Sequence, residues 1–266
     1  MKIEVLVATM NQNDHSLLDK MNIKTDAIIG NQCNRNEIED FLYNSCNIKW
    51  LSFKEKGLSL NRNNALLRSS ADICVLADDD EVFYDDYEKI IVSAFDKLPQ
   101  ADILIFNIDE ITSKRYKNTK IKKINRYNFG RYGSVRIVFK RAKISLSNIY
   151  FNINFGSGTQ FNCGEDTLFL KECIEKKLKI YAVPESFAKL TEERESTWFE
   201  GYTDKYFFDK GIIFYYLNRR FCKLMALIHC IKNRKLYSQI GWFKSYKKIK
   251  VGINNSKIFY LLNKSH

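Results

Sequence analysis

Three consecutive carboxylates, Asp78, Asp79 and Asp80, directly follow the apolar run 73–77 in the stretch VLADDDE. Adjacent carboxylates repel one another, and a bound cation relieves that repulsion best. Hard divalent cations take oxygen ligands, and Mg²⁺ commonly binds one or two carboxylates together with substrate phosphates. The triplet therefore indicates a metal–phosphate site. A solvated acidic turn that caps the next helix is the structural alternative, because acids favour helix N-termini.

A second acidic pair, Glu165 and Asp166, follows a glycine-containing stretch and opens a segment with helical spacing. A carboxylate at a helix start can act as a general base and take a proton from an attacking sugar hydroxyl. A plain helix-capping pair is the alternative. Arg62 lies in the helix predicted at residues 57–70, and its guanidinium suits a phosphate or a carboxylate because it donates two parallel hydrogen bonds. Taken alone, Arg62 would be read as a surface arginine.

Short apolar runs alternate with segments of helical spacing along the chain. The runs predict strands at residues 3–8, 26–30, 48–53, 72–77, 101–108, 135–141 and 179–185. The spacing of apolar residues predicts helices at residues 35–46, 57–70, 84–98 and from 164 onward. This alternation predicts an α/β fold with a mostly parallel, doubly wound sheet. Ligands of such sheets bind outside the carboxyl ends of the strands, where the acidic triplet lies.

The charge distribution divides the chain near residue 200. Residues 202–266 contain fourteen Lys and Arg but only two acids, whereas residues 1–201 hold 29 bases and 29 acids. We therefore predict a body at 1–200 and a basic, aromatic, helical region at 201–266.

The seven scattered cysteines include no CxxC pair, which favours buried reduced thiols in a cytosolic protein over disulfides or zinc.

Three motifs in this order resemble inverting family 2 glycosyltransferases with the GT-A fold. GLSLNRNNALLRSSADICVLADDD resembles the family's glycine, Arg-Asn and terminal-aspartate pattern, and CGEDTLFL resembles its downstream acidic motif. The opening strand followed by ATMNQ is similar to the family's first nucleotide-contacting strand and loop. The resemblance covers roughly residues 1–200. It implies a GT-A catalytic domain, which the basic helical region follows as an appendage.

The resemblance implies roles for the acidic residues. Asp78 and Asp80 match the outer aspartates of the DxD motif, which contact the ribose and a divalent metal, Mg²⁺ or Mn²⁺, that bridges the donor diphosphate. Asp79 matches the middle position and is expected to face the nucleotide. Asp166 matches the catalytic base and Glu165 its neighbour.

The resemblance also implies a nucleotide pocket. Thr9 and Asn11 match loop positions near the base and ribose, and Arg62 matches an arginine beside the nucleotide. Where the family usually carries an Asp-Asp-Gly-Ser turn that holds the nucleobase, this chain has GNQCNRN, with Asn31 as the nearest match. An amide cannot offer a carboxylate to the base, so the identity of the donor base stays open.

The activity that the resemblance implies is metal-dependent, inverting glycosyl transfer of the hexosyltransferase type. The expected donor is a nucleoside-diphosphate sugar, with a UDP-sugar favoured. The expected acceptor is a glycan or lipid-linked molecule in bacterial surface polysaccharide synthesis. A nucleotidyltransferase, which would release pyrophosphate, and a non-catalytic membrane or polyanion-binding adaptor are the alternatives.

The basic region has three readings: a helical appendage with solvated charges, a peripheral membrane surface attracted to anionic lipid, or a nucleic-acid surface, which the composition favours least. Its aromatic residues could instead line an acceptor site, the candidates being Tyr206, Phe207, Phe208 and Tyr215.

The N-terminal apolar run is too short for a signal peptide, and no run reaches the roughly 18–20 apolar residues of a membrane span. We therefore expect a cytoplasmic protein, peripheral on the inner face of the cell membrane. The sequence does not indicate an oligomeric state.

Overall fold

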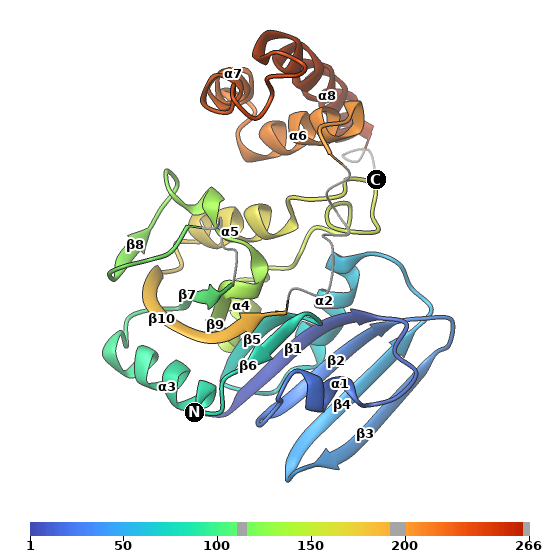
Figure 1. Cartoon of the computed structure of the whole chain (residues 1–266), viewed down its shortest axis with the longest axis vertical. Helices are drawn as coiled ribbons and strands as arrows, with labels where there is room; N and C mark the ends of the chain where they lie inside the picture. Colours follow the sequence, from blue (N-terminus) through green and yellow to red (C-terminus); the bar gives the residue numbers. More distant parts are fainter. Residues whose placement is uncertain (111–115, 192–200, 263–266) are drawn as a thin grey trace. The chain divides into compact units, whose positions relative to one another are not determined.

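The computed structural model describes residues 1–110, 116–191 and 201–262, with side chains up to residue 256 in the last segment. The chain divides into two compact units (Figure 1). One comprises Met1–Gln160 and Glu165–Glu195, and the other Phe161–Gly164 and Ser196–His266. Each unit has its own hydrophobic core. The sequence-based domain boundary near residue 200 stays a prediction, because compact packing alone does not show that a segment folds independently.

A ten-stranded mixed sheet forms the larger unit, in the order β3-β4-β2-β1-β5-β9-β7-β10-β6 with β8 beside β10. Four neighbouring strands run parallel: β4 (Cys46–Phe53), β2 (Asp26–Gln32), β1 (Ile3–Met10) and β5 (Ile73–Asp78). The other strands are β3 (Glu37–Tyr43), β6 (Glu81–Phe83), β7 (Ile103–Asp109), β8 (Lys122–Ile124), β9 (Ile137–Lys140) and β10 (Ile180–Leu190). The predicted mixed, mostly parallel α/β sheet is confirmed.

Helices cover both faces of this sheet, which explains why its strands read as continuous apolar runs. Alternate residues of β1 enter different cores: Val5 and Val7 pack with α1 and α3, and Leu6 packs with α2, α4 and α5. The helices are α1 (Leu17–Lys20), α2 (Leu58–Arg68), α3 (Tyr87–Lys97), α4 (Arg141–Leu146) and α5 (Glu165–Glu175). Two short 3₁₀ turns, Phe129–Arg131 and Ser134–Arg136, precede β9.

The strand register brings three predicted site residues to one edge of the sheet. Thr9 of β1 pairs with Asn31 of β2, and Ala8 pairs with Asp78 of β5. All three strands are parallel, so their carboxyl ends meet at this edge. The sheet therefore presents the first loop, the second turn and the acidic triplet side by side.

The helix predicted at residues 35–46 is wrong, because this segment contains the edge strand β3. Ile38, Phe41 and Leu42 have helical spacing, but Phe41 faces the core while Ile38 and Leu42 are exposed. The strand pairs antiparallel with β4 along its whole length. An edge strand buries only one face, so its apolar residues need not follow the strand period of two residues. Pairing with β4 stabilises the strand here in spite of the helical spacing.

Three helices form the smaller unit around a core of their own: α6 (Asp204–Leu217), α7 (Cys222–Lys232) and α8 (Trp242–Leu262). Thr203 caps α6 by accepting a hydrogen bond from the N–H of Tyr206. Phe207 and Tyr215, named above as acceptor-site candidates, are buried in this core and hold the bundle together. Across the described part of the chain, none of the helices combines the length and the apolar character needed to cross a bilayer.

Two glycines allow α6 and α8 to touch backbone to backbone. A Cβ on Gly211 would come within 2.2 Å of the Ile249 carbonyl oxygen, and a Cβ on Gly252 would come within 2.1 Å of the Phe208 carbonyl oxygen. Both contacts are with backbone atoms, which cannot rotate away as a flexible side chain would.

We expect Gly252→Ala to lower the free energy of unfolding by about 3 kcal/mol, because the helices must separate to admit the methyl group. Urea titration of the wild type and the variant measures this loss. Asn254→Ala, at an exposed position of the same helix, is the control and should change stability little. An equal stability of the Gly252 variant and the wild type would show that the helices do not cross this closely.

Candidate active site

The acidic triplet lies on a turn that one side-chain and one backbone hydrogen-bond partner hold in place. Glu81 accepts a hydrogen bond from the N–H of Asp78 through Oε1 at 2.8 Å. Thr191, directly after β10, donates its N–H to the carbonyl oxygen of Asp80 at 2.8 Å. The turn is thus held from both sides, while the side chains of Asp78, Asp79 and Asp80 stay partly exposed.

Arg62 joins the two acidic motifs. Its Nη2 donates to Asp78 Oδ1 at 2.6 Å, and its Nη1 donates to Glu165 Oε1 at 3.2 Å. The side chain is 1% exposed, so both ion pairs lie in a weakly screened environment. Helix α2 positions the guanidinium, and the motifs around residues 78 and 165 converge on it from distant parts of the chain. A contact of Arg62 with the nucleotide stays a prediction.

Burial and charge act in opposite directions at this centre. Burial disfavours the guanidinium cation of Arg62, but Asp78 and Glu165 more than offset that effect, so its pKa stays above the ordinary value. Burial and then the negative charge of Asp166 raise the pKa of Glu165 to about 7, against the opposing effect of Arg62. Glu165 therefore exchanges a proton near neutral pH.

Removing this titrating group should change how stability depends on pH. The folded protein retains a proton on Glu165 that the unfolded chain releases between pH 4.5 and 7. The stability that Glu165 contributes is therefore present below pH 4.5 and lost as the pH rises to 7. Relative to the wild type, we expect Glu165→Gln to gain up to about 3 kcal/mol between pH 5 and 8. Urea titrations across this range measure the difference. A difference that does not vary with pH would contradict the raised pKa.

Asp166 occupies the first turn of α5, beside Glu165, and is only partly buried. Its Oδ1 accepts hydrogen bonds from the N–H of Thr167 at 2.6 Å and from the Thr167 hydroxyl at 3.2 Å. Its Oδ2 lies beside Gly133, where a Cβ would stand 3.6 Å away. A helix N-terminus stabilises a carboxylate, so the position favours the charged form that a general base requires.

The first loop is tied to the acidic triplet. Thr9 donates its hydroxyl to Asp79 Oδ2 at 2.6 Å, and the Gln12 side-chain amide donates to Thr9 Oγ1 at 2.9 Å. Asn11 is exposed and has a left-handed backbone conformation with φ of 56°, which asparagine tolerates well. Thr9 thus connects the end of β1 to the middle aspartate.

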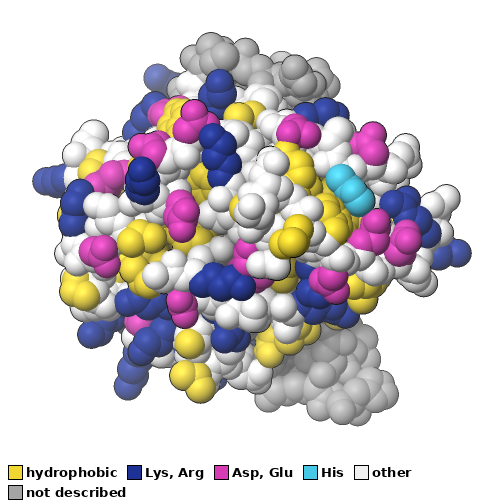
Figure 2. Space-filling model, turned by 90° about the horizontal axis from the view of Figure 1, so that it is seen from below, with side chains coloured by type: hydrophobic (Ala, Val, Ile, Leu, Met, Phe, Trp, Pro, Cys, Tyr) yellow, Lys and Arg dark blue, Asp and Glu magenta, His cyan; other side chains and the backbone are white. Residues whose placement is uncertain are grey.

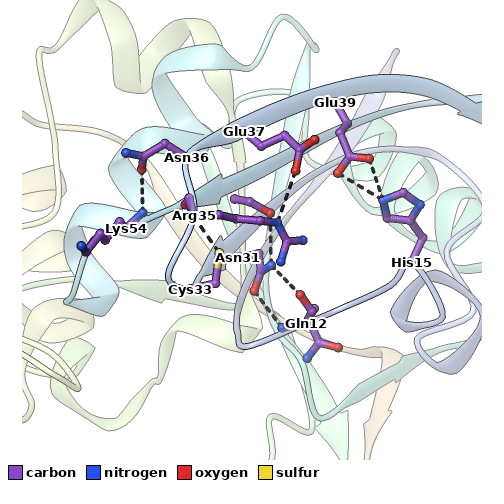
Figure 3. A network of polar contacts seen from close by, with 10 residues as sticks. Gln12, His15, Asn31, Cys33, Arg35, Asn36, Glu37, Glu39 and Lys54 are labelled. Carbon is purple, nitrogen blue, oxygen red and sulfur yellow. Dashed lines mark hydrogen bonds and ion pairs between the residues drawn. The ribbon is translucent and has the colours of Figure 1, made fainter.

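Asn31 is hydrogen-bonded to Gln12 of this loop (Figure 3). Its Oδ1 accepts from the N–H of Gln12, and its Nδ2 donates to the Gln12 carbonyl oxygen, each at 3.0 Å. The same Nδ2 also donates to Ser52 Oγ at 3.2 Å, and the side chain is fully buried. These bonds make Asn31 a positioning residue for the loop. A direct contact between Asn31 and a nucleotide stays a prediction.

The turn after β2 presents its own polar groups near the first loop. Figure 3 shows the side chain of Arg35 reaching toward Glu37, and its Nε lies 3.3 Å from Glu37 Oε2. Asn36 accepts the N–H of Lys54, and Cys33 lies against the Arg35 carbonyl oxygen. These contacts order the segment where the resemblance places nucleobase recognition.

Glu81 directly follows the triplet but belongs to none of the three motifs quoted above for the family resemblance. Glu81 is 1% exposed, and its Oε2 has no hydrogen-bond partner among the described residues. Burial and the neighbouring charge of Asp78 raise its pKa well above the ordinary value. The sequence does show a fourth acid directly after the three aspartates. It does not show whether that acid is buried and hydrogen-bonded to the turn or exposed to solvent.

The described residues include no group of three or more His, Cys, Asp or Glu side chains arranged to hold a metal ion. The turn nevertheless fits a metal that arrives with a diphosphate, because such a metal needs only one or two carboxylates. The resemblance implies Asp80 and Asp78 as the protein ligands, and both side chains are partly exposed on this turn. The donor atoms are hard oxygens, as Mg²⁺ and Mn²⁺ require.

The parallel β4-β2-β1-β5 region with acids at its carboxyl edge, flanked by helices on both faces, defines the GT-A class of fold. Residues 4–176, more than half of the chain, match the sequence model of Glycosyl transferase family 2. The chain belongs to this family and is a glycosyltransferase.

Solved structures of S. aureus TarS share the fold. TarS 1-349 in complex with UDP-GlcNAc is similar with a TM-score of 0.62 and 15% identity, covering 90% of this chain and 73% of that one. TarS 1-349 in complex with UDP gives a TM-score of 0.58 at 15% identity, over 90% and 72% of the two chains. A longer TarS chain gives 0.56 at 16% identity, over 80% of this chain and 39% of its own length. Comparison with curated protein sequences gives no match.

Proposed function

We propose that the chain transfers a sugar from a nucleoside-diphosphate donor to an acceptor hydroxyl, with inversion at the anomeric carbon and with help from a divalent metal. The observation that carries this proposal is the double ion pair of Arg62 with Asp78 and Glu165. Arg62 thereby links the acidic turn, which we propose binds the diphosphate, to Glu165. Glu165 is the neighbour in sequence of Asp166, the candidate for the general base. Neither motif alone would support a transfer reaction.

The carboxyl edge of the sheet suits the donor. In this proposal Thr9, Asp79 and the first loop bind the nucleoside, and Asp78 and Asp80 bind the ribose and the diphosphate. The hydrogen bonds from Thr9 to Asp79 and from Thr191 to Asp80 support it, because they fix the loop and the turn. Asp80, with Asp78, would hold Mg²⁺ or Mn²⁺, which offsets the negative charge that develops on the departing diphosphate. TarS 1-349 has been solved with UDP-GlcNAc and with UDP, which supports a uridine diphosphate sugar as the donor class.

The two acids of the second motif have different parts in this proposal. Asp166 takes the proton from the acceptor hydroxyl, since it is partly exposed and lies at a helix N-terminus. Glu165 holds the guanidinium of Arg62 in place and is a weak candidate for the base, because it is buried. The acceptor hydroxyl attacks from the side opposite the diphosphate, and a single displacement gives inversion. A glycan or lipid-linked acceptor of a surface polysaccharide is the class we propose.

A thermal-shift screen of nucleotide sugars, with Mn²⁺ or with EDTA, tests the donor. A ligand that binds only the folded protein at a concentration of 100 Kd stabilises it by about 2.7 kcal/mol, so the melting temperature rises. We expect a UDP-sugar to give the largest rise and Mn²⁺ to increase it. Turnover of that donor with acceptor should release UDP. Release of pyrophosphate would instead identify a nucleotidyltransferase, and no stabilisation by any nucleotide sugar would contradict the proposal.

A further inference from the structure

Helix α7 carries an exposed apolar stripe on the side opposite its buried face. Leu224, Ile228 and Ile231 are 52%, 44% and 45% exposed, and their spacing of four and three residues places them on one side of the helix. Ala226 and Cys230 of the same helix are fully buried in the core of the smaller unit. Single exposed apolar residues are normal, whereas a continuous stripe marks an interaction surface.

The stripe extends beyond the helix toward its N-terminus. Phe221, three residues before Leu224, is 49% exposed, and we call Phe221, Leu224, Ile228 and Ile231 the α7 stripe. Further exposed apolar side chains follow in the next segment and the first turn of α8, namely Leu236, Trp242 and Phe243. An apolar surface of this kind in water needs a partner that can accept hydrocarbon.

Positive charge surrounds the stripe. The sequence from residue 210 to residue 266 contains thirteen Lys and Arg and no Asp or Glu. Lys223, Lys232 and Lys235 lie within or next to α7 and are exposed. Elsewhere the surface is different: on the face shown in Figure 2, basic and acidic side chains are interspersed. The C-terminal surface is therefore complementary in charge to an anionic partner.

Three partners could accept such a surface, and lipid fits best. A second copy of the chain would bring like charges together around the stripe. Nucleic acid would match the charge, but three of the four residues of the α7 stripe are Leu or Ile, which cannot stack on bases as aromatic side chains do. An anionic membrane matches both properties, since apolar residues enter the acyl boundary while lysines stay among the headgroups.

We propose that α7 is a membrane-docking helix that lies in the plane of an anionic lipid surface, with the α7 stripe inserted and the flanking lysines at the headgroups. The helix has 11 residues, about 16 Å in length, so it can lie in the interface but cannot span the roughly 30 Å hydrocarbon core. This inference goes beyond sugar transfer and does not depend on the identity of the donor. It gives the enzyme a location at which membrane-bound acceptors are concentrated.

Flotation of the full chain with vesicles tests this proposal. We expect binding to phosphatidylcholine vesicles that contain phosphatidylglycerol, and much weaker binding to phosphatidylcholine alone. The triple variant Leu224→Ser, Ile228→Ser and Ile231→Ser should lose about tenfold or more in partitioning. A second variant, in which Lys223, Lys232 and Lys235 become Gln, should lose about fivefold for each lysine that reaches the surface, and high salt should mimic it.

A matched control removes exposed apolar surface elsewhere. Leu42 on β3 is 72% exposed, and Leu42→Ser should leave vesicle binding unchanged. Circular dichroism melting identifies any variant that fails to fold. If the serine variant does not fold, the lysine variant still tests the proposal, because its substitutions are at exposed positions. Unchanged binding in both variants would overturn the proposal, as would equal binding to neutral vesicles or no binding at all. A dimer that the serine variant dissolves would also overturn it, because the stripe would then be a contact between copies.

Discussion

We expect the Asp166→Asn variant to transfer sugar at least about 100-fold more slowly than the wild type, with little change in the affinity for the donor. The amide has nearly the shape of the carboxylate but cannot accept the proton of the acceptor hydroxyl. The hydrogen bond from the N–H of Thr167 can persist to the remaining carbonyl oxygen, so the start of α5 should keep its structure. Steady-state measurement of UDP release with saturating donor and acceptor gives kcat directly.

The control for this variant is Asp86→Asn, the same substitution at the start of α3. Asp86 is exposed and lies outside the cluster of acids, so we expect wild-type turnover. Calorimetric titration of both variants with UDP separates binding from chemistry. Turnover of the Asp166 variant within a few-fold of the wild type would remove Asp166 from the role of base.

Among the variants considered, Arg62→Met should lower the free energy of unfolding most, by about 3–5 kcal/mol. The substitution leaves the acidic groups of Asp78 and Glu165 without their cation. We also expect weaker donor binding, since the acidic turn and α5 lose the group that joins them. Lys would replace Arg62 poorly, because one ammonium cannot reproduce the two forked hydrogen bonds. Urea titration measures the stability, and UDP titration measures the binding.

Arg68→Met provides a matched control on the same helix. Arg68 is exposed, its Nη1 donates to the backbone oxygen and side chain of Asn64, and its guanidinium lies 5.3 Å from the centre of the Phe53 ring, so we expect a loss of about 1 kcal/mol or less. Adding Glu165→Gln to the Arg62 variant should restore part of the stability, because one of the two neighbouring carboxylates, which carry like charges, is then removed. Equal stability of the Arg62 variant and the wild type would contradict the structural role of this ion-pair centre.

The sequence predicted most of the sheet because parallel strands buried on both faces leave a clear signal. The runs 3–8, 26–30 and 72–77 became β1, β2 and β5, each almost wholly buried. The edge strand β3 carries no such signal, since only one of its faces packs, and the spacing of its apolar residues predicts a helix instead. Short elements such as β6 depend on distant partners, here β10, and no local pattern reveals them.

The resemblance implies one site for Asp78, Arg62, Glu165 and Asp166. The structure joins Arg62 to Asp78 and to Glu165 by ion pairs, and the roles of all four residues stay predictions. Sequence could not show that Arg62 is buried, because burial depends on how α2 packs against the sheet. It likewise could not show that the amide of Asn31 is used entirely within the protein.

Calorimetric titration of the wild type and Asp80→Asn with UDP, in Mn²⁺ and in EDTA, tests the central claim most directly. If the turn at Asp80 holds a metal against the donor diphosphate, wild-type affinity should be at least about tenfold higher with Mn²⁺. In Asp80→Asn this ratio should fall close to one. Equal affinity with and without Mn²⁺ in the wild type, or a metal effect that survives in Asp80→Asn, would contradict the account.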